Sequence, residues 1–105
     1  MYTIKIMNEF LHGAVWVYED GIPSSWDKID NDSVLSDLNR KTMELYASYF
    51  DFNGEEGSCT FDENLEKQTK EEMLLLISQI KKRLAELNDE GFEVEDYVTE
   101  RLIAL

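Results

Sequence analysis

The segment YTIKIMNEFLHGAVWVYEDG, residues 2–21, governs the fold because it holds two short runs of β-forming residues separated by six residues. In the first run, residues 2–7, Ile4 and Ile6 share one face, and polar residues occupy the other. The second run, residues 14–18, has the same β-rich composition and is followed by turn-forming residues. The sequence therefore predicts a β-hairpin at the start of the chain.

The next segment changes from irregular to helical chemistry. Residues 22–32 combine Pro23 with several Asp and Asn side chains, a composition typical of irregular chain. Apolar residues then recur at helical spacing, which predicts a helix over residues 33–50. Asp32 or Ser33 is the expected cap of this helix.

A second helix is predicted after a glycine-containing segment. Residues 51–61 hold two glycines and are expected to form a loop or a short hairpin. Asp62 or Asn64 then caps a longer helix that runs to about residue 88, with an apolar stripe along one side. Gly91 follows the predicted end of this helix.

The end of the chain completes the predicted fold. Residues 92–95 alternate apolar and acidic side chains, which predicts a third strand. Residues 97–105 fit either a strand or a short helix. The fold class predicted is α+β: a small antiparallel sheet, made of the N-terminal hairpin and a C-terminal strand, with two helices packed on one face. Residues 1–105 are expected to form a single acidic domain.

The charge of the chain restricts its partners. It has 23 acidic and 10 basic residues and a formal net charge of −13. Such a chain lacks the basic face that nucleic acids and anionic membranes require, so we expect neither as a partner, whereas a basic protein suits it. No transmembrane run or secretory signal is visible, and Cys59 has no second cysteine to pair with, so we expect a cytoplasmic protein.

Catalytic motifs are missing from the sequence. His12 lies in the connection of the predicted hairpin, and Cys59 has acidic neighbours that disfavour a reactive thiolate. No calcium-loop, zinc or phosphate-binding pattern occurs, so we predict no enzyme activity, no metal and no cofactor. A small enzyme that acts through paired carboxylates is the alternative from a different functional class.

Acidic residues gather in three stretches with few bases, residues 19–32, 51–66 and 86–100, which predicts a negative field around these segments. Trp26 lies in the first stretch and is either packed on the sheet or offered to a partner. Trp16, inside a strand, is expected in the core. The candidate binding residues are Asp20, Trp26, Asp27, Asp30, Glu55, Glu56, Glu93 and Glu95.

Residues 2–10, YTIKIMNEF, together with Gly13 and residues 16–18, WVY, resemble small immunity proteins of bacterial polymorphic toxin systems, including contact-dependent growth inhibition. The resemblance implies a cytoplasmic protein that binds the C-terminal toxin domain of its own system one to one and neutralises it. Such toxins are often nucleases, whose cationic grooves an acidic protein can occupy. The alternative is an acidic regulatory or DNA-mimic module that sequesters a nucleic-acid-binding protein, and a toxin gene immediately upstream would separate the two.

Overall fold

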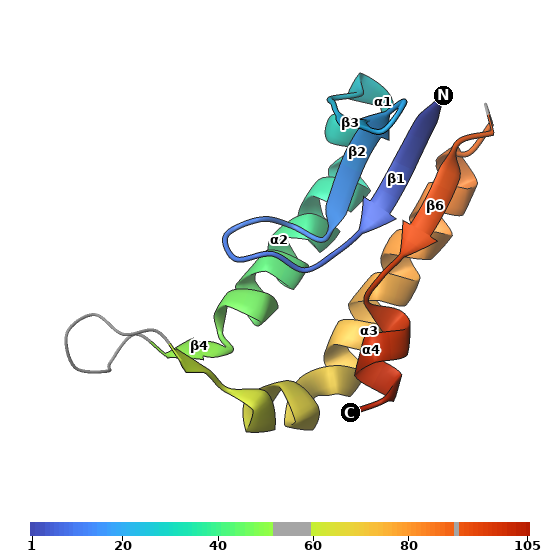
Figure 1. Ribbon diagram of the computed structural model, residues 1–105. Helices are drawn as coiled ribbons and strands as arrows, with labels where there is room; N and C mark the ends of the chain where they lie inside the picture. The colour runs from blue at the N-terminus through green and yellow to red at the C-terminus, as the bar shows by residue number, and fades with distance from the viewer. Residues whose placement is uncertain (52–59, 90) are drawn as a thin grey trace.

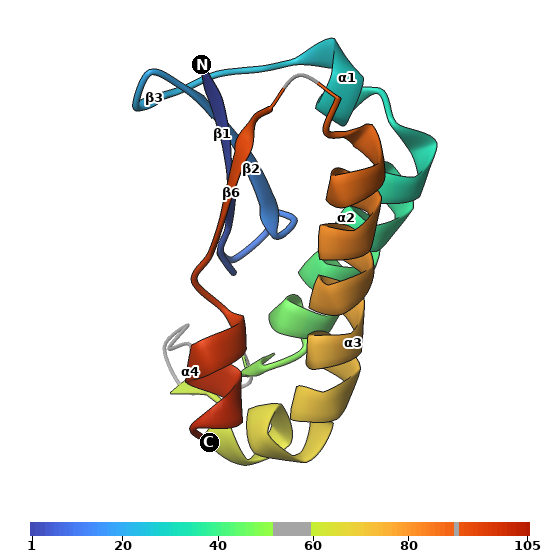
Figure 2. The same cartoon turned by 90° about the vertical axis from the view of Figure 1, so that its right-hand side faces the viewer.

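The computed structural model describes residues 1–51, 60–89 and 91–105. Along the chain the elements are β1 (Tyr2–Ile6), β2 (Val15–Glu19), β3 (Ile22–Pro23), α1 (Asp27–Asp30), α2 (Ser33–Ala47), β4 (Phe50–Asp51), β5 (Thr60–Phe61), α3 (Glu63–Leu87), β6 (Glu93–Asp96) and α4 (Thr99–Ile103). The predicted α+β class is confirmed. A four-stranded sheet forms one layer, and the long helices α2 and α3 cover one of its faces (Figure 2).

The sheet is mixed, whereas the sequence predicted an antiparallel one. Its strand order is β3-β2-β1-β6, and β2 runs antiparallel to both of its neighbours. In contrast β6 pairs with β1 in parallel, with Ile4 opposite Val94. The reason is that α2 leads the chain away from the end where β1 begins and α3 returns it there (Figure 1). Residue alternation reveals the two faces of a strand but not its direction.

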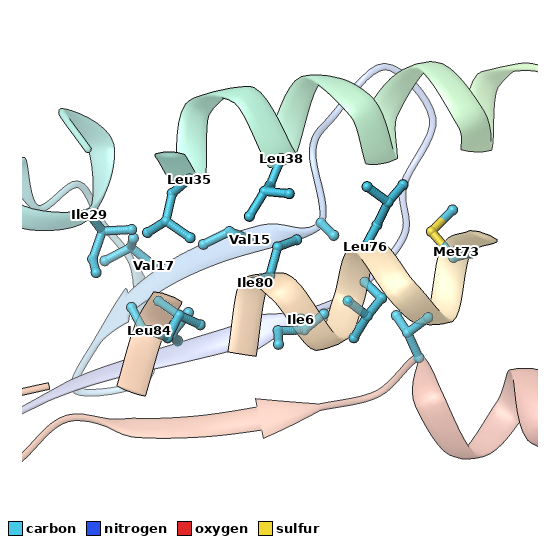
Figure 3. Close-up of a cluster of buried hydrophobic side chains, with 14 of the residues drawn as sticks. Ile6, Val15, Val17, Ile29, Leu35, Leu38, Met73, Leu76, Ile80 and Leu84 are labelled. Atoms are coloured by element: carbon cyan, nitrogen blue, oxygen red, sulfur yellow. The ribbon is translucent and has the colours of Figure 1, made fainter. Parts of the chain in front are cut away.

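The helix-facing side of the sheet builds the core. Ile4 lies opposite Val17 and Ile6 opposite Val15, and all four side chains are buried. The helices add the apolar stripes that their spacing predicted (Figure 3). The buried side chains of these stripes are Leu35, Leu38, Met73, Leu76, Ile77, Ile80 and Leu84. Removal of this apolar surface from water is the main source of the fold's stability.

Three short elements were not predicted or were left open. Residues 22–32 contain β3 and α1 and are not irregular throughout. Pro23 fits β3 because an edge strand needs no donor on its outer side. The single turn of α1 is closed by Asp30, whose carboxylate accepts a hydrogen bond from the Trp26 amide at 2.8 Å, and it buries Ile29. The open choice for residues 97–105 is settled as the helix α4.

The long helices begin at the expected caps. The Asp32 carboxylate accepts a hydrogen bond from the Leu35 amide at 2.9 Å, and Asp62 accepts one from the Leu65 amide at 3.0 Å. These bonds satisfy backbone donors that have no partner within the first turn. The helix α2 ends at Ala47, earlier than the predicted residue 50, because the chain turns there into β4.

Asp32 also joins α2 to α3. Its carboxylate accepts hydrogen bonds from Arg83, at 2.6 Å from Nη2 and 3.1 Å from Nε. The hydrogen bond from Arg83 lowers the pKa of Asp32 below its ordinary value and outweighs the opposing effect of burial. One carboxylate therefore caps one helix and holds the neighbouring helix against it.

This double role predicts a pH-dependent variant. Asp32→Asn is expected to lower the Tm by about 5 °C near pH 7, because asparagine keeps the helix cap but removes the charge that Arg83 faces. The folded-state pKa of Asp32 lies below its unfolded value of about 3.9. The stabilisation by the charge is therefore present above the unfolded-state pKa, and it is lost as the pH falls through the folded-state pKa. Thermal unfolding of both proteins from about pH 7 to about pH 2.5 tests this, and a constant Tm difference would contradict it.

Candidate protein-interaction surface

The side of the sheet that faces away from α2 and α3 is covered by no helix of the described residues (Figure 2). We call it the outer sheet face. Strand register arranges its side chains in two rows that run across β2, β1 and β6. The rows are Trp16–Lys5–Glu95 and Tyr18–Thr3–Glu93. An uncovered sheet face with aromatic and charged side chains has the composition of a binding surface.

Contacts within the outer sheet face hold its side chains in place. The Lys5 ammonium lies 4.0 Å from a Glu95 carboxylate oxygen and 4.5 Å from the centre of the Tyr18 ring. The Tyr97 hydroxyl donates a hydrogen bond to Glu95 at 2.6 Å, and this bond to a carboxylate raises the pKa of Tyr97. Fixed side chains lose less conformational freedom when a partner binds, which favours affinity.

Trp16 belongs to this face, so the expectation that it lies in the core is wrong. Strand alternation turns Val15 and Val17 towards the helices and Trp16 away from them. Its indole is half-buried because the His12 ring stacks on it, with centroids 3.7 Å apart. The indole N–H donates to the Met7 carbonyl at 3.1 Å. Trp16 therefore presents a fixed, partly exposed ring.

Acidic residues also lie at the end of the molecule where β1 begins, namely Asp20, Asp27, Asp30 and Glu93. We call this set the acidic end. Glu93 lies opposite Thr3 at the start of β1, and Asp20 pairs with the terminal amine at 3.0 Å. The helix α1 places its two aspartates at the same end of the molecule (Figure 1). Four predicted binding residues therefore lie at this end of the molecule, with α1 on the helix-facing side of the sheet and Glu93 on the outer sheet face (Figure 2), while Glu95 lies further along β6.

Trp26 packs on the sheet, the first of its two predicted alternatives. Its ring stacks on Tyr2, with centroids 4.1 Å and planes 3° apart, and meets Phe92 edge-on at 5.6 Å. The Lys28 ammonium lies 5.6 Å from the Trp26 ring centre and also pairs with Asp89. Trp26 therefore packs against the core next to α1, with only part of its surface exposed.

The basic residues are mostly engaged within the chain. Seven of the ten pair with carboxylates: Lys5, Lys28, Arg40, Lys41, Lys81, Arg83 and Arg101. Among the described residues, no basic side chain pairs with Asp27, Asp30 or Glu93. Since paired charges largely cancel at a distance, the acidic end keeps a negative field.

Two further features, a cluster of metal ligands and a membrane-spanning helix, are absent from the described residues. Across residues 1–51, 60–89 and 91–105, no three His, Cys, Asp or Glu side chains gather as metal ligands. Over the same residues, no helix combines the length and apolar character needed to cross a membrane. The predicted binding residues Glu55 and Glu56, and Cys59, lie outside the described residues.

Of the outer sheet face, Glu93 and Glu95 were among the predicted binding residues, whereas Thr3, Lys5, Trp16, Tyr18 and Tyr97 were not. Alternation in the first strand already placed Lys5 on the face opposite Ile4, but its contact with Glu95 depends on the parallel pairing of β1 with β6. Tyr97 follows β6, and no sequence pattern assigned it to this surface.

Comparison of the chain with protein-family models, with curated proteins and with solved structures found no match. Its function is therefore inferred from the outer sheet face and the acidic end.

Proposed function

We propose that this chain is an immunity protein that binds a cationic toxin domain, a nuclease, one to one in the cytoplasm and neutralises it. The observation that carries the proposal is the acidic end, where Asp27, Asp30 and Glu93 face solvent with no basic partner among the described residues. The neighbouring outer sheet face adds partly exposed aromatic rings. Carboxylates around aromatic anchors suit a partner whose surface is rich in Lys and Arg.

The physics of association favours this function. A nuclease presents cationic side chains to the phosphates of its substrate, so an acidic protein matches the potential of the substrate groove. Opposite potentials also accelerate encounter, and an inhibitor must capture its toxin before the toxin reaches nucleic acid. Inhibition by occupation of a surface requires no bond-making by the inhibitor.

A charge-reversal pair tests the proposal. The probe is the C-terminal domain encoded by the gene immediately upstream of the gene for this chain. We expect Asp27→Lys with Glu93→Lys to slow association at low salt by about tenfold or more and to flatten its salt dependence. Both side chains are exposed and make no ion pair among the described residues, so we expect their reversal to leave the fold in place.

A matched control separates local from overall charge. Glu71→Lys with Glu72→Lys changes the net charge equally, on the exposed side of α3. We expect this variant to associate much faster than the first. Equal slowing by both variants would remove the acidic end from the interface. The absence of an upstream toxin gene, or a toxin domain that does not bind the wild-type chain, would refute the proposed function.

A further inference from the structure

The turn between β1 and β2 holds an apolar side chain in an unfavourable backbone conformation. The His12 amide donates to the Glu9 carbonyl at 3.2 Å, which closes a four-residue turn with Leu11 at its third position. Leu11 has a φ of 62° and its side chain is 68% exposed. Glycine or asparagine is the usual residue where a turn needs a positive φ at this position. Leucine here therefore opposes the stability of the turn and also exposes apolar surface to water.

The chain on both sides of Leu11 is held firmly. The Met7 amide donates to the Ala14 carbonyl at 2.9 Å, and the Val15 amide donates to Asn39 of α2 at 3.0 Å. Gly13 approaches Asn39 so closely that an added Cβ would lie 2.7 Å from that side chain. The rigid base fixes the direction in which the tip of the turn points, so Leu11 is presented in one place.

The tip of the turn continues the outer sheet face. His12, next to Leu11, stacks on Trp16, and Phe10 contacts Phe50 with ring centroids 4.8 Å apart. Glu9, the first residue of the turn, is exposed. Leu11 is therefore an apolar tip that lies beside a carboxylate and an aromatic surface.

Exposure alone does not single out Leu11. Ile22 and Ile103 are exposed to the same degree, at 68% and 65%. Neither has a positive φ, so their positions cost the backbone nothing. Only at Leu11, among the described residues, do an exposed aliphatic side chain and a left-handed backbone coincide. Such strain, when the local fold does not need the side chain, is typical of functional sites.

We infer that Leu11 is the apolar anchor of the interface with the toxin domain and enters an apolar pocket bordered by Lys and Arg side chains. The inference rests on the proposed function and adds the position of the anchor. Charge complementarity selects the partner: Glu9, in the same turn as Leu11, is exposed and makes no ion pair among the described residues. An anchor ringed by polar contacts is the usual arrangement at the centre of a protein interface.

Leu11→Asn tests the inference, since asparagine tolerates the left-handed conformation. We expect the Tm to stay unchanged or to rise, because strain is relieved and no buried contact is lost. Dissociation from the upstream-encoded toxin domain is expected to accelerate about 30-fold, the effect of losing an interface hot spot. Ile103→Asn, at an equally exposed aliphatic side chain on α4, is the matched control and is expected to leave dissociation unchanged.

The outcomes separate this inference from the proposed function. A clear fall in Tm for Leu11→Asn would show that Leu11 stabilises the fold, and would overturn the inference without any partner. If the wild-type chain binds the toxin domain and Leu11→Asn binds equally tightly, the inference fails and the proposed function stands. If the wild-type chain does not bind, the proposed function fails and the inference fails with it.

Discussion

Arg101→Ala is expected to lower the free energy of unfolding by about 3–5 kcal/mol, the cost of removing one partner of a buried ion pair. The Glu66 side chain on α3 is only 1% exposed, and both of its oxygens accept hydrogen bonds from Arg101 on α4, at 2.6 and 2.8 Å. Removal of the guanidinium leaves a buried carboxylate without a cation. Urea denaturation monitored by circular dichroism measures the change.

Substitutions of the two partners are expected to lower the free energy of unfolding by different amounts. Arg101 is 52% exposed, so after Glu66→Leu it remains solvated, and that variant should cost clearly less than Arg101→Ala. The double variant Glu66→Leu with Arg101→Leu buries no charge and should recover most of the loss. Equal costs for the two single variants would show that burial of Glu66 does not control the stability of this contact.

Trp26→Ala is expected to lower the free energy of unfolding by about 3 kcal/mol, because the indole packs against both Tyr2 and Phe92 beside the core. Trp16→Ala is the matched control. Its ring lies on the outer sheet face, where it stacks on His12 alone among the ring contacts described, so we expect a loss of about 1 kcal/mol. Chemical denaturation of the two variants gives the comparison.

Comparison of the two tryptophan variants also distinguishes a structural role from a binding role. Loss of Trp26 is expected to weaken the fold, whereas under the proposed function loss of Trp16 is expected to act mainly on partner binding. A Trp16→Ala variant less stable than Trp26→Ala would reverse these roles.

The regular elements were predictable because their signals are local. The alternation of Ile4 and Ile6 defined a strand face, helical spacing defined α2 and α3, and Asp32 and Asp62 act as the caps expected of their side chains. Each signal depends on residues within a few positions of one another, so one sequence is enough to find it.

The remaining features depend on contacts between distant residues. The direction of β6 follows from the path of α2 and α3, and α1 is closed by a side-chain contact that composition does not report. The pairing of Glu66 with Arg101 joins two helices, so nothing in the sequence marks Glu66 as buried among the many acids.

The candidate surfaces were predictable only in part. Acidic stretches marked Asp27 and Glu93 correctly as exposed carboxylates. The sequence could not show which acids are paired by bases, because Lys28 reaches Asp89 and Arg83 reaches Asp32 across the fold. The sequence also gave no reason to choose Leu11, because a positive φ is expected of glycine or asparagine and not of leucine.

Ribosomal synthesis produces β1 long before β6, although the two strands are hydrogen-bonded neighbours in the finished sheet. Until residues 93–96 emerge, one edge of β1 exposes backbone N–H and C=O groups that any extended chain can pair with. Pairing between segments so far apart in sequence is also slow, because a long loop must close first. The nascent chain is therefore most open to mispairing during this interval, while the edge of β1 that later pairs with β6 is exposed.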